Sequence, residues 1–388
     1  MEKKPLSFYL HIPFCSAKCD YCDFVSFPLH IIKRETVNQY FSALYQELEL
    51  RLWALPDDYY LHTLYIGGGT PSTVDPDYYQ PVVKRLQQRF NAPVEFTCEV
   101  NPKSVDAPFL ERLRDLGCNR ISVGVQSPSD DTLARVNRSQ TLGLFLLKYD
   151  MIRKVYDNVN VDFICGLPEN LHDWARGSLD LIQKAAPEHV SLYLLESEKE
   201  TPLGVKERKG FIDLPSQSYA ESFIESMSIT LPAMGFNQYE ISNYARPGYA
   251  SLHNLVYWKG VDYIGVGVSA GGYIHHRRYV NTAGLMQYIT SLERHNTIDE
   301  AYSQVNTAKE DLKERLFMGL RLREGIDFGQ LKRGVSETAS LERIRFILSH
   351  SPYFFETESG KLRFISEYFL KNREAFEFLF EVFDITGF

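Results

Sequence analysis

The sequence contains no long apolar run. Nowhere in its 388 residues does a stretch approach the roughly 18 consecutive apolar residues of a transmembrane helix, so such a helix is excluded. The opening MEKKPLSFYLHIPF carries two lysines but neither an apolar core nor a small-residue cleavage site, so we predict no signal peptide. Basic charge is also scarce, since 42 lysines and arginines face 50 aspartates and glutamates, a net charge of −8. This balance argues against nucleic acid as the main partner.

Cysteine is rare outside one short segment. The chain has six cysteines, and three of them lie within eight residues near the N-terminus. So few cysteines, clustered in this way, suit a protein of the reducing cytoplasm better than a disulfide framework. The other three, Cys98, Cys118 and Cys165, stand in apolar or strand-like surroundings, where we expect buried thiols.

The clustered cysteines are Cys15, Cys19 and Cys22, in HIPFCSAKCDYCDF. A C-x3-C-x2-C loop supplies three thiolates and leaves a polynuclear iron cluster one protein ligand short. An iron with an open coordination site can bind and reduce a small molecule, whereas a fully ligated iron mainly passes electrons. The alternative is a structural zinc site with His11 as the fourth ligand, although zinc loops more often pair two C-x2-C motifs. The spacing therefore favours the iron–sulfur cluster.

Short β-branched or aromatic runs alternate with amphipathic helical stretches through most of the chain. Such alternation implies parallel strands joined by right-handed crossovers, hence an α/β barrel or a doubly wound sheet. The predicted strands are Ser7–Ile12, Thr63–Ile66, Glu95–Val100, Arg120–Gly124, Asn160–Ile164 and His189–Leu194. The predicted helices are Val37–Leu52, Tyr78–Arg89, Ala107–Leu116, Leu142–Lys154, Trp174–Ala185 and Ser218–Ala233.

Unusual residues lie at the ends of these strands. The cysteine loop follows the first strand, the glycine-rich turn 67–71 follows the second, and Glu99 lies at the end of the third. Gln126 follows the fourth strand, Asp162 lies in the fifth, and Glu196 follows the sixth. In a parallel barrel all these carboxyl ends open on one face, where ligands bind. The pattern therefore predicts one ligand site at the barrel mouth.

Several of these residues suit a ligand that resembles an amino acid. The glycines of the 67–71 turn let the backbone approach a ligand closely, and the turn lacks the lysine of a phosphate-binding P-loop. Glu99 is either a solvated charge or the anchor of a sulfonium or an amine. Gln126 and Arg138 are either surface groups or partners of ribose hydroxyls and a carboxylate. Asp162 stands in an apolar strand, where an unpaired carboxylate is costly, so we expect it to face the ligand.

One histidine stands out among aromatic residues. His253 precedes Tyr257 and Trp258 in SLHNLVYW, on a segment expected to cross near the barrel mouth. A lone histidine is more often a hydrogen-bonded structural residue, and the alternative is a haem-iron ligand. His275 and His276 are rival candidates for that ligand.

Beyond residue 296 the pattern changes to helix, helix, hairpin and helix. We therefore divide the chain into a large domain, 1–296, and a small α+β domain, 297–388, that looks winged-helix-like. Its predicted elements are Lys309–Arg321, Ala339–Leu348, the hairpin Tyr353–Phe364 and Ser366–Phe383. The acidic composition favours a structural or substrate-covering role for this domain over DNA binding.

Together these motifs resemble those of the radical S-adenosylmethionine superfamily. The resemblance covers nearly the whole chain, through segments such as IGGGTPS, EVNP, RISVGVQS, DFICGLP and GVGVSA. It implies a partial (β/α)6 TIM-like barrel and a [4Fe–4S] cluster on Cys15, Cys19 and Cys22, with S-adenosylmethionine on the fourth iron. The residues implied to contact S-adenosylmethionine are Tyr9, Gly69, Thr70, Glu99, Gln126, Arg138, Asp162, Glu196 and Gly271.

Within the superfamily the chain looks like the branch of oxygen-independent coproporphyrinogen dehydrogenases and HemW-type haem chaperones. The dehydrogenase pattern has a fourth cysteine two residues after the third, whereas Phe24 stands there in this chain. His253 matches a histidine suspected of haem contact in the chaperone group. Departures from the branch pattern at Gln140, Glu169-Asn170 and Gly271-Gly272 leave the cysteine motif intact.

These features favour a cytoplasmic haem chaperone. The resemblance implies that it binds the cluster, S-adenosylmethionine and haem, and delivers haem to acceptor proteins, including membrane-associated ones. An electron donor such as a flavodoxin or ferredoxin is a further implied partner. The alternative is an enzyme, oxygen-independent coproporphyrinogen III dehydrogenase, which oxidatively decarboxylates propionate side chains. A winged-helix regulator that senses redox state is a remoter alternative, which the acidic charge disfavours. No residue is assigned a catalytic role.

Overall fold

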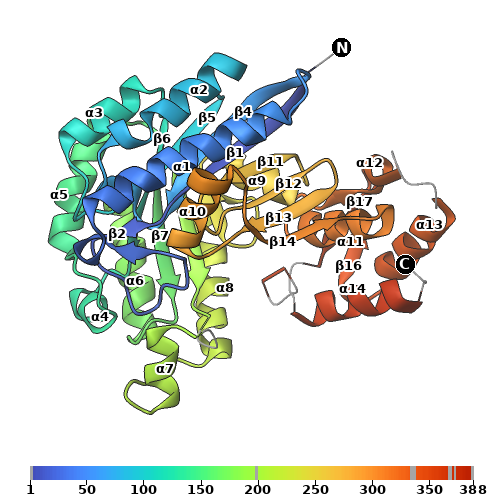
Figure 1. The fold of residues 1–388 in the computed structure, drawn as a ribbon. Helices are drawn as coiled ribbons and strands as arrows, with labels where there is room; N and C mark the ends of the chain where they lie inside the picture. Colours follow the sequence, from blue (N-terminus) through green and yellow to red (C-terminus); the bar gives the residue numbers. More distant parts are fainter. Residues whose placement is uncertain (1–2, 197–199, 333–337, 366–368, 371–372, 386–388) are drawn as a thin grey trace.

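The computed structural model describes residues 3–196, 200–332, 338–365, 369–370 and 373–385 (Figure 1). Its main feature is a twelve-stranded sheet in the order β14-β13-β12-β11-β1-β4-β5-β6-β7-β8-β10-β9. Six central strands are adjacent and parallel, namely β1 (Lys4–Ile12), β4 (Tyr59–Gly68), β5 (Glu95–Val100), β6 (Arg120–Gln126), β7 (Val159–Cys165) and β8 (His189–Leu194). They are the six predicted strands in chain order, which confirms the parallel α/β prediction.

Shorter strands extend the sheet at both edges. Beside β1 lie β11 (Tyr263–Val266), which is parallel to it, and then the antiparallel β12 (Gly271–Ile274), β13 (Arg277–Asn281) and β14 (Glu300–Val305). Beside β8 lie β10 (Asn243–Ala245) and β9 (Asn237–Gln238). Since β14 and β9 remain the two edges of the described sheet, the barrel is partial, as predicted. A separate pair, β2 (Phe14–Cys15) and β3 (Phe27–Pro28), brackets the cysteine loop.

Helices connect the parallel strands and pack on the outer face of the sheet (Figure 1). Those that match the predicted helices are α1 (Arg34–Trp53), α2 (Gln80–Phe90), α3 (Ala107–Asp115), α5 (Leu142–Arg153), α6 (Leu171–Ala185) and α8 (Gln217–Ala233). Asp106, Thr141 and Asn170 cap α3, α5 and α6 by accepting from backbone N–H groups that the first helical turn leaves unpaired. The predictions did not include α4 (Asp130–Arg135), α7 (Pro202–Arg208), α9 (Leu252–Trp258) or α10 (Leu285–His295).

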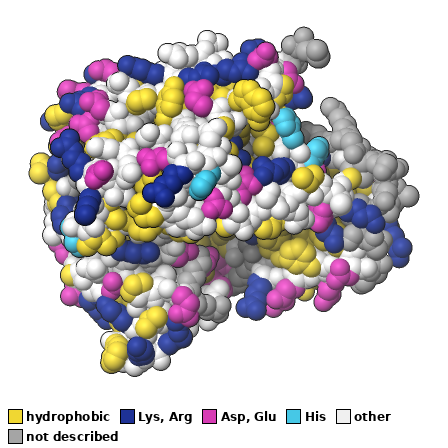
Figure 2. Space-filling view, viewed as in Figure 1, with side chains coloured by type: hydrophobic (Ala, Val, Ile, Leu, Met, Phe, Trp, Pro, Cys, Tyr) yellow, Lys and Arg dark blue, Asp and Glu magenta, His cyan; other side chains and the backbone are white. Residues whose placement is uncertain are grey.

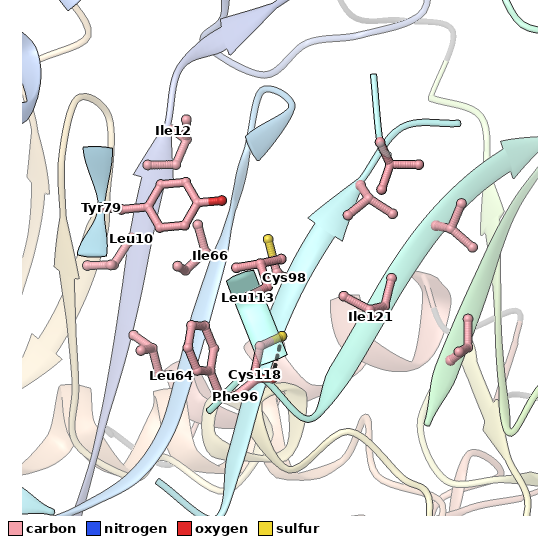
Figure 3. Packing of buried hydrophobic residues seen from close by; sticks show 14 of the residues in the cluster. Leu10, Ile12, Leu64, Ile66, Tyr79, Phe96, Cys98, Leu113, Cys118 and Ile121 are labelled. Carbon is pink, nitrogen blue, oxygen red and sulfur yellow. Dashed lines mark hydrogen bonds between the residues drawn. The ribbon is translucent and has the colours of Figure 1, made fainter. Parts of the chain in front are cut away.

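Alternate residues of the parallel strands give the sheet an apolar face and a polar face. Leu10, Leu64 and Phe96 belong to the large core between the sheet and the helices (Figure 3). The residues between them on the same strands carry polar or aromatic groups toward the barrel interior, and include Ser7, Tyr9, Thr63, Tyr65, Thr97, Glu99, Arg120, Ser122, Asn160, Asp162, Ser191 and Tyr193. Because buried polar groups are costly when unpaired, this interior requires internal hydrogen bonds or a ligand.

The chain beyond residue 306 forms a small unit with its own hydrophobic core. Its elements are α11 (Ala308–Gly319), β15 (Ile326–Asp327), α12 (Phe328–Lys332), α13 (Thr338–Ser349), β16 (Phe354–Glu356), β17 (Lys361–Phe364) and α14 (Arg373–Ile385). The two predicted helices and the hairpin are confirmed, whereas residues 366–368 and 371–372 of the predicted last helix lie outside the described residues. The division at 296/297 stays a prediction, although residues 300–305 form β14 of the main sheet.

The charge on the visible face of the molecule is mixed. Figure 2 shows basic and acidic side chains interspersed over this face, without a broad basic patch of the kind that binds nucleic acid. In the part of the chain that the structure covers, no helix combines the length and the apolar character needed to cross a bilayer.

Candidate functional site

A cavity of about 380 Å³ opens at the carboxyl ends of the parallel strands. Its lining draws on the cysteine loop and on the ends of β4 to β8. Ten of the predicted site residues line it, namely Cys15, Cys19, Cys22, Gly69, Thr70, Glu99, Gln126, Arg138, Asp162 and Glu196. The fold therefore gathers strand ends that are distant in sequence around one site, as the barrel interpretation required.

The cysteine loop is held from two sides by contacts to Asp20. The Asp20 N–H donates to the Val136 carbonyl at 3.0 Å, and the Asp20 carbonyl accepts from the Leu203 N–H at 2.8 Å. The Asp20 carboxylate also pairs with Lys206 at 2.5 Å. Tyr21, in the same loop, packs against a small apolar cluster that includes Val136 and Leu203. The loop is thereby fixed against the segments around α4 and α7.

The surroundings of His11 argue against the zinc alternative. Its Nδ1 lies 3.1 Å from the Tyr9 hydroxyl, and its Nε2 lies 2.8 Å from the Val25 carbonyl, so both ring nitrogens already have partners. Burial lowers the pKa of His11 to about 4. Within the described ranges, no three His, Cys, Asp or Glu side chains are grouped closely enough to hold a single metal ion. A zinc ion needs all its ligands within about 2.3 Å, whereas a cubane spreads its thiolates over separate irons.

The glycine turn passes directly beneath the end of β1. Gly68 has a φ of +107°, and a Cβ there would lie 2.5 Å from Nδ1 of His11. A Cβ on Gly69 would lie 2.8 Å from the carbonyl oxygens of Ile12 and Phe14. Side chains at these positions would therefore displace the strand that leads into the cysteine loop. Close backbone packing explains these glycines, in addition to any approach of a ligand.

Glu99 lies under the glycine turn with its carboxylate in the cavity wall. Its Oε1 accepts from the Tyr65 hydroxyl at 2.7 Å, and its Oε2 accepts from the Gly68 N–H at 3.1 Å. Burial raises the pKa of Glu99 to about 7. Glu99 is therefore not a solvated charge at the end of a strand. The remaining interpretation is that it binds a cationic group of a ligand.

Arg138 joins the cysteine loop to the end of β6. Its Nη1 donates to the Tyr21 hydroxyl at 2.9 Å and lies 3.8 Å from Cys19 Sγ, while its Nη2 donates to the Gly124 carbonyl at 2.7 Å. A Cβ on Gly124 would lie only 2.3 Å from Nε2 of Gln126, so this glycine makes room for two predicted ligand-binding side chains. Gln126 itself adopts a φ of +70°, which is uncommon for a residue with a side chain.

Asp162 belongs to a hydrogen-bonded network on the barrel wall. Its two carboxylate oxygens accept from Ser122 at 3.1 Å and from Asn160 at 2.7 Å. Asn160 in turn lies 2.6 Å from His189 and accepts from Ser191 at 3.1 Å. Burial raises the pKa of Asp162. These hydrogen bonds offset the free energy lost when the carboxylate is buried in this strand. Asp162 faces the cavity, as predicted.

Sequence analysis missed several residues of the cavity wall. Tyr65, Arg120, Asn160, Tyr193 and Asn254 line the cavity but were not predicted. The first four occupy inward-facing positions of β4, β6, β7 and β8. The signal that could have found them is the alternation of polar and apolar residues along β4 to β8, which is unusual for buried parallel strands.

The segment of His253 reaches the cavity, as expected, because its neighbour Asn254 lines it, but His253 itself is not part of the lining. Its backbone N–H and that of Leu252 donate to Glu95, at the start of β5, both at 2.9 Å. Its Nδ1 lies 2.7 Å from the Thr63 hydroxyl and its Nε2 lies 2.8 Å from the Tyr257 hydroxyl. Both ring nitrogens of His253 therefore have protein partners, near the amino ends of the parallel strands. The structure does not support the assignment of His253 as a ligand of haem iron.

Four other predicted residues also lie outside the cavity lining. Tyr9 stands behind it and contacts His11, and Gly271 begins β12 opposite Val280. His275 and His276 form the turn between β12 and β13, where His275 lies 3.0 Å from the Tyr59 hydroxyl and His276 pairs with Asp311. The two histidines thus hold the hairpin to its neighbours, because each ring faces a different partner.

Comparison with known proteins gives the family. A profile described as the Radical SAM superfamily matches residues 9–176. The heme chaperone HemW of Lactococcus lactis subsp. lactis (strain IL1403) is 31% identical over 332 residues, which cover 84% of this chain and 84% of that protein. The chain belongs to the HemW family of radical SAM proteins. The heme chaperone HemW of Bacillus subtilis (strain 168) is 32% identical over 326 residues, covering 82% of this chain and 84% of that protein.

A solved structure agrees with this membership at the level of the fold. Coproporphyrinogen III oxidase (HemN) from Escherichia coli superposes with a TM-score of 0.79, covering 97% of this chain and 90% of that one. The two sequences are 22% identical, so the likeness is one of fold. It extends over the small C-terminal unit as well as the partial barrel. The radical SAM fold predicted from the motifs is thus confirmed.

The residues at the mouth fit the cofactors that radical SAM membership implies. Three thiols border one cavity, with the Thr70 hydroxyl 3.3 Å from Cys15 Sγ and the Arg138 guanidinium beside Cys19. Burial raises the pKa of Cys22 to about 11, and the Phe24 backbone and the Lys18 charge act in the opposite direction, toward the thiolate form that iron requires. Nε of Arg138 is buried and has no hydrogen-bond partner in the described part of the chain. This orphaned donor is suited to a carboxylate such as that of a bound amino acid.

Proposed function

We propose that the protein is a haem chaperone that holds a [4Fe–4S] cluster and S-adenosylmethionine at the barrel mouth and passes haem to acceptor proteins. One observation carries the cofactor part of this proposal: the three cysteines and seven of the nine predicted S-adenosylmethionine contacts border a single cavity. When bound, the cluster supplies an iron with an open coordination site, able to transfer one electron to a small molecule. The haem part rests on the similarity to HemW proteins named as heme chaperones.

The cavity wall matches the functional groups of S-adenosylmethionine. Arg138 offers a guanidinium donor for the carboxylate, and the backbone around Gly69 can receive the amine. Glu99 and Asp162 provide negative charge near a sulfonium, and Gln126 offers an amide to ribose hydroxyls. In this arrangement Tyr65 keeps Glu99 oriented, since its hydroxyl donates to the carboxylate at 2.7 Å.

Phe24 supports the choice of the chaperone over the dehydrogenase. It stands where the dehydrogenase pattern has a fourth cysteine, lines the cavity and leaves 62% of its surface exposed. An exposed aromatic ring at the rim offers a flat apolar face to a planar tetrapyrrole. The further partners in this proposal are acceptor proteins, including membrane-associated ones, and an electron donor such as a flavodoxin or ferredoxin. The proposed location is the cytoplasm.

Anaerobic reconstitution with iron and sulfide tests the cluster. We expect about four irons per chain in the wild type and a nearly complete loss in Cys19→Ala, because a cubane with two protein thiolates is poorly held. Cys165→Ala is the matched control, since that thiol is fully buried outside the cavity and should leave the iron content unchanged. Wild-type iron content in Cys19→Ala would exclude the assigned ligands.

An anaerobic assay with coproporphyrinogen III, S-adenosylmethionine and a reductant separates the chaperone from the dehydrogenase. The chaperone should bind haem saturably and leave coproporphyrinogen unchanged. Decarboxylated product, detected by chromatography, would replace the chaperone proposal with the enzyme.

A further inference from the structure

Arg120 has no hydrogen-bond or ion-pair partner among the residues that the structure describes. It begins β6, is 2% exposed, and lines the cavity beside Ser122 and Asn160. Its guanidinium forms no hydrogen bond or ion pair with any residue that the structure describes, and its Nε is a buried donor without a partner. An arginine side chain carries five N–H donors and a permanent charge, so burying it unpaired is costly. Such a group is expected to meet an anionic ligand.

The other two basic residues of the cavity lining are already engaged. Arg138 donates to Tyr21 and to the Gly124 carbonyl, and Lys18 donates to the Phe24 carbonyl at 3.2 Å. If Arg138 receives the carboxylate of S-adenosylmethionine, as the motif pattern implies, Arg120 remains for a second carboxylate. The cavity thus has one cation more than that cofactor alone requires.

The neighbouring acids do not neutralise Arg120 by direct contact. Glu99 takes its hydrogen bonds from Tyr65 and Gly68, and Asp162 takes its own from Ser122 and Asn160. Burial raises the pKa of both acids and the charge of Arg120 offsets this only in part, and neither acid forms an ion pair with the guanidinium. The carboxylate oxygens of both acids accept from other donors, so the Arg120 guanidinium faces the cavity.

The surroundings favour a carboxylate over a more highly charged anion. Four acidic residues line the cavity against three basic ones, which disfavours a dianion such as phosphate. A planar carboxylate matches the guanidinium fork and carries a single charge. Arg120 begins its strand four residues before Gly124, about 13 Å along β6. Its ligand group must therefore extend inward on an arm from a molecule that occupies the mouth.

We propose that Arg120 binds a propionate of the tetrapyrrole, and so selects porphyrins whose carboxylates are free. This inference rests on the haem-binding function proposed above and identifies how the same site recognises its ligand. In this proposal the ring enters past the exposed Phe24, and a propionate turned into the cavity meets the guanidinium, which extends from β6 toward the ligand.

Two ligands that differ only in whether the propionate carboxylates are free or esterified test the inference. Haem and haem dimethyl ester, delivered anaerobically in the same co-solvent, are titrated into reconstituted protein and followed by absorbance. We expect wild type to bind haem about 10- to 100-fold more tightly than the ester, the range of a charge-assisted hydrogen-bonded pair. Arg120→Gln should bind both compounds with nearly equal affinity, and Arg120→Lys should fall between.

Lys18→Gln is the matched control, because Lys18 is also a basic side chain of the cavity lining and its charge could attract a propionate in place of Arg120. It should keep the wild-type preference for haem, and a loss of the preference in Lys18→Gln alone would overturn the inference. Equal binding of haem and ester by wild type would also overturn it while leaving the chaperone proposal intact. No saturable binding of either compound would overturn both. If Arg120→Gln instead weakened only S-adenosylmethionine binding, Arg120 would belong to that cofactor.

Discussion

The carboxylate of Glu47, on α1, is fully buried and accepts five hydrogen bonds. Its Oε1 accepts two from Arg51, at 3.1 and 3.2 Å, and one from Asn281 at 2.8 Å. Its Oε2 accepts from the Gly267 N–H at 2.8 Å and from the Tyr288 hydroxyl at 2.6 Å. A single carboxylate thus joins α1, α10 and the loop after β11.

This network supports the strand that leads into the cysteine loop. Gly267 has a φ of +113°, and a Cβ there would lie 2.5 Å from the Tyr40 hydroxyl and 2.8 Å from the His11 carbonyl. The Tyr40 hydroxyl in turn donates to the His11 carbonyl at 2.6 Å. Glu47 therefore acts on the end of β1 through Gly267, although it lies outside the cavity.

Glu47→Leu keeps a side chain of similar size but removes every acceptor. Arg51 retains Glu300 at 3.0 Å, while the other donors lose their partner. Breaking a buried ion pair by removing one member costs about 3–5 kcal/mol. At an unfolding entropy of about 2.1 cal/mol/K per residue, a 388-residue chain loses about 1 °C of melting temperature per 0.8 kcal/mol. The expected fall is therefore about 4–6 °C.

Glu49→Leu, on the same helix, is the matched control. The Glu49 side chain is 39% exposed and pairs with Arg85 at 2.5 Å, so its removal should cost less than about 1 kcal/mol. Scanning calorimetry of both variants under anaerobic conditions measures the difference. We also expect Glu47→Leu to retain less iron after reconstitution. If both variants melted at the same temperature, the argument from burial and hydrogen bonding would be refuted.

Three further predictions concern single residues. Burial raises the pKa of Glu240 to about 7, so the stabilisation from its protonated form is complete below about pH 4.5 and is lost as the pH rises to 7. In denaturant titrations, the free energy of unfolding of Glu240→Gln should gain up to about 3 kcal/mol relative to that of wild type over this pH range. Parallel pH curves for the two proteins would contradict this. Gly124→Val should weaken S-adenosylmethionine binding at least about 10-fold by calorimetry, because its side chain would displace Gln126, and unchanged affinity would remove Gln126 from the site. His253→Ala should leave the absorption maximum of bound haem in place while lowering the melting temperature; a shifted maximum would restore His253 as an iron ligand.

The order of strands and helices could be predicted because its signals are local. β1 and β8 alternate or cluster apolar residues over six to nine positions, and helices such as α3 begin at a capping aspartate. The cysteine loop and the glycine turn were visible as motifs that follow particular strands. Parallel topology then placed them at one face, since all carboxyl ends of a parallel barrel point the same way.

Strand alternation indicates which residues face the interior, but only the three-dimensional structure shows which of them line the cavity. Arg120 starts its strand at the end away from the mouth, yet its side chain lines the cavity. His253 was expected to face the cavity, but Glu95 holds the start of α9 at the amino end of β5, and protein partners take both ring nitrogens of His253. Both outcomes depend on contacts between segments that sequence periodicity does not relate.

By itself, the sequence determined the parallel α/β fold, the three-thiol loop and the strand ends on which ligand-binding residues stand, because spacing and alternation act within a few residues. Only the tertiary structure decided which side chains meet. It left Arg120 without a partner among the described residues, engaged both nitrogens of His253 and buried Glu47 among five donors. The reason is physical: hydrogen bonding and burial are properties of neighbours in space, and those neighbours come from strands more than a hundred residues apart.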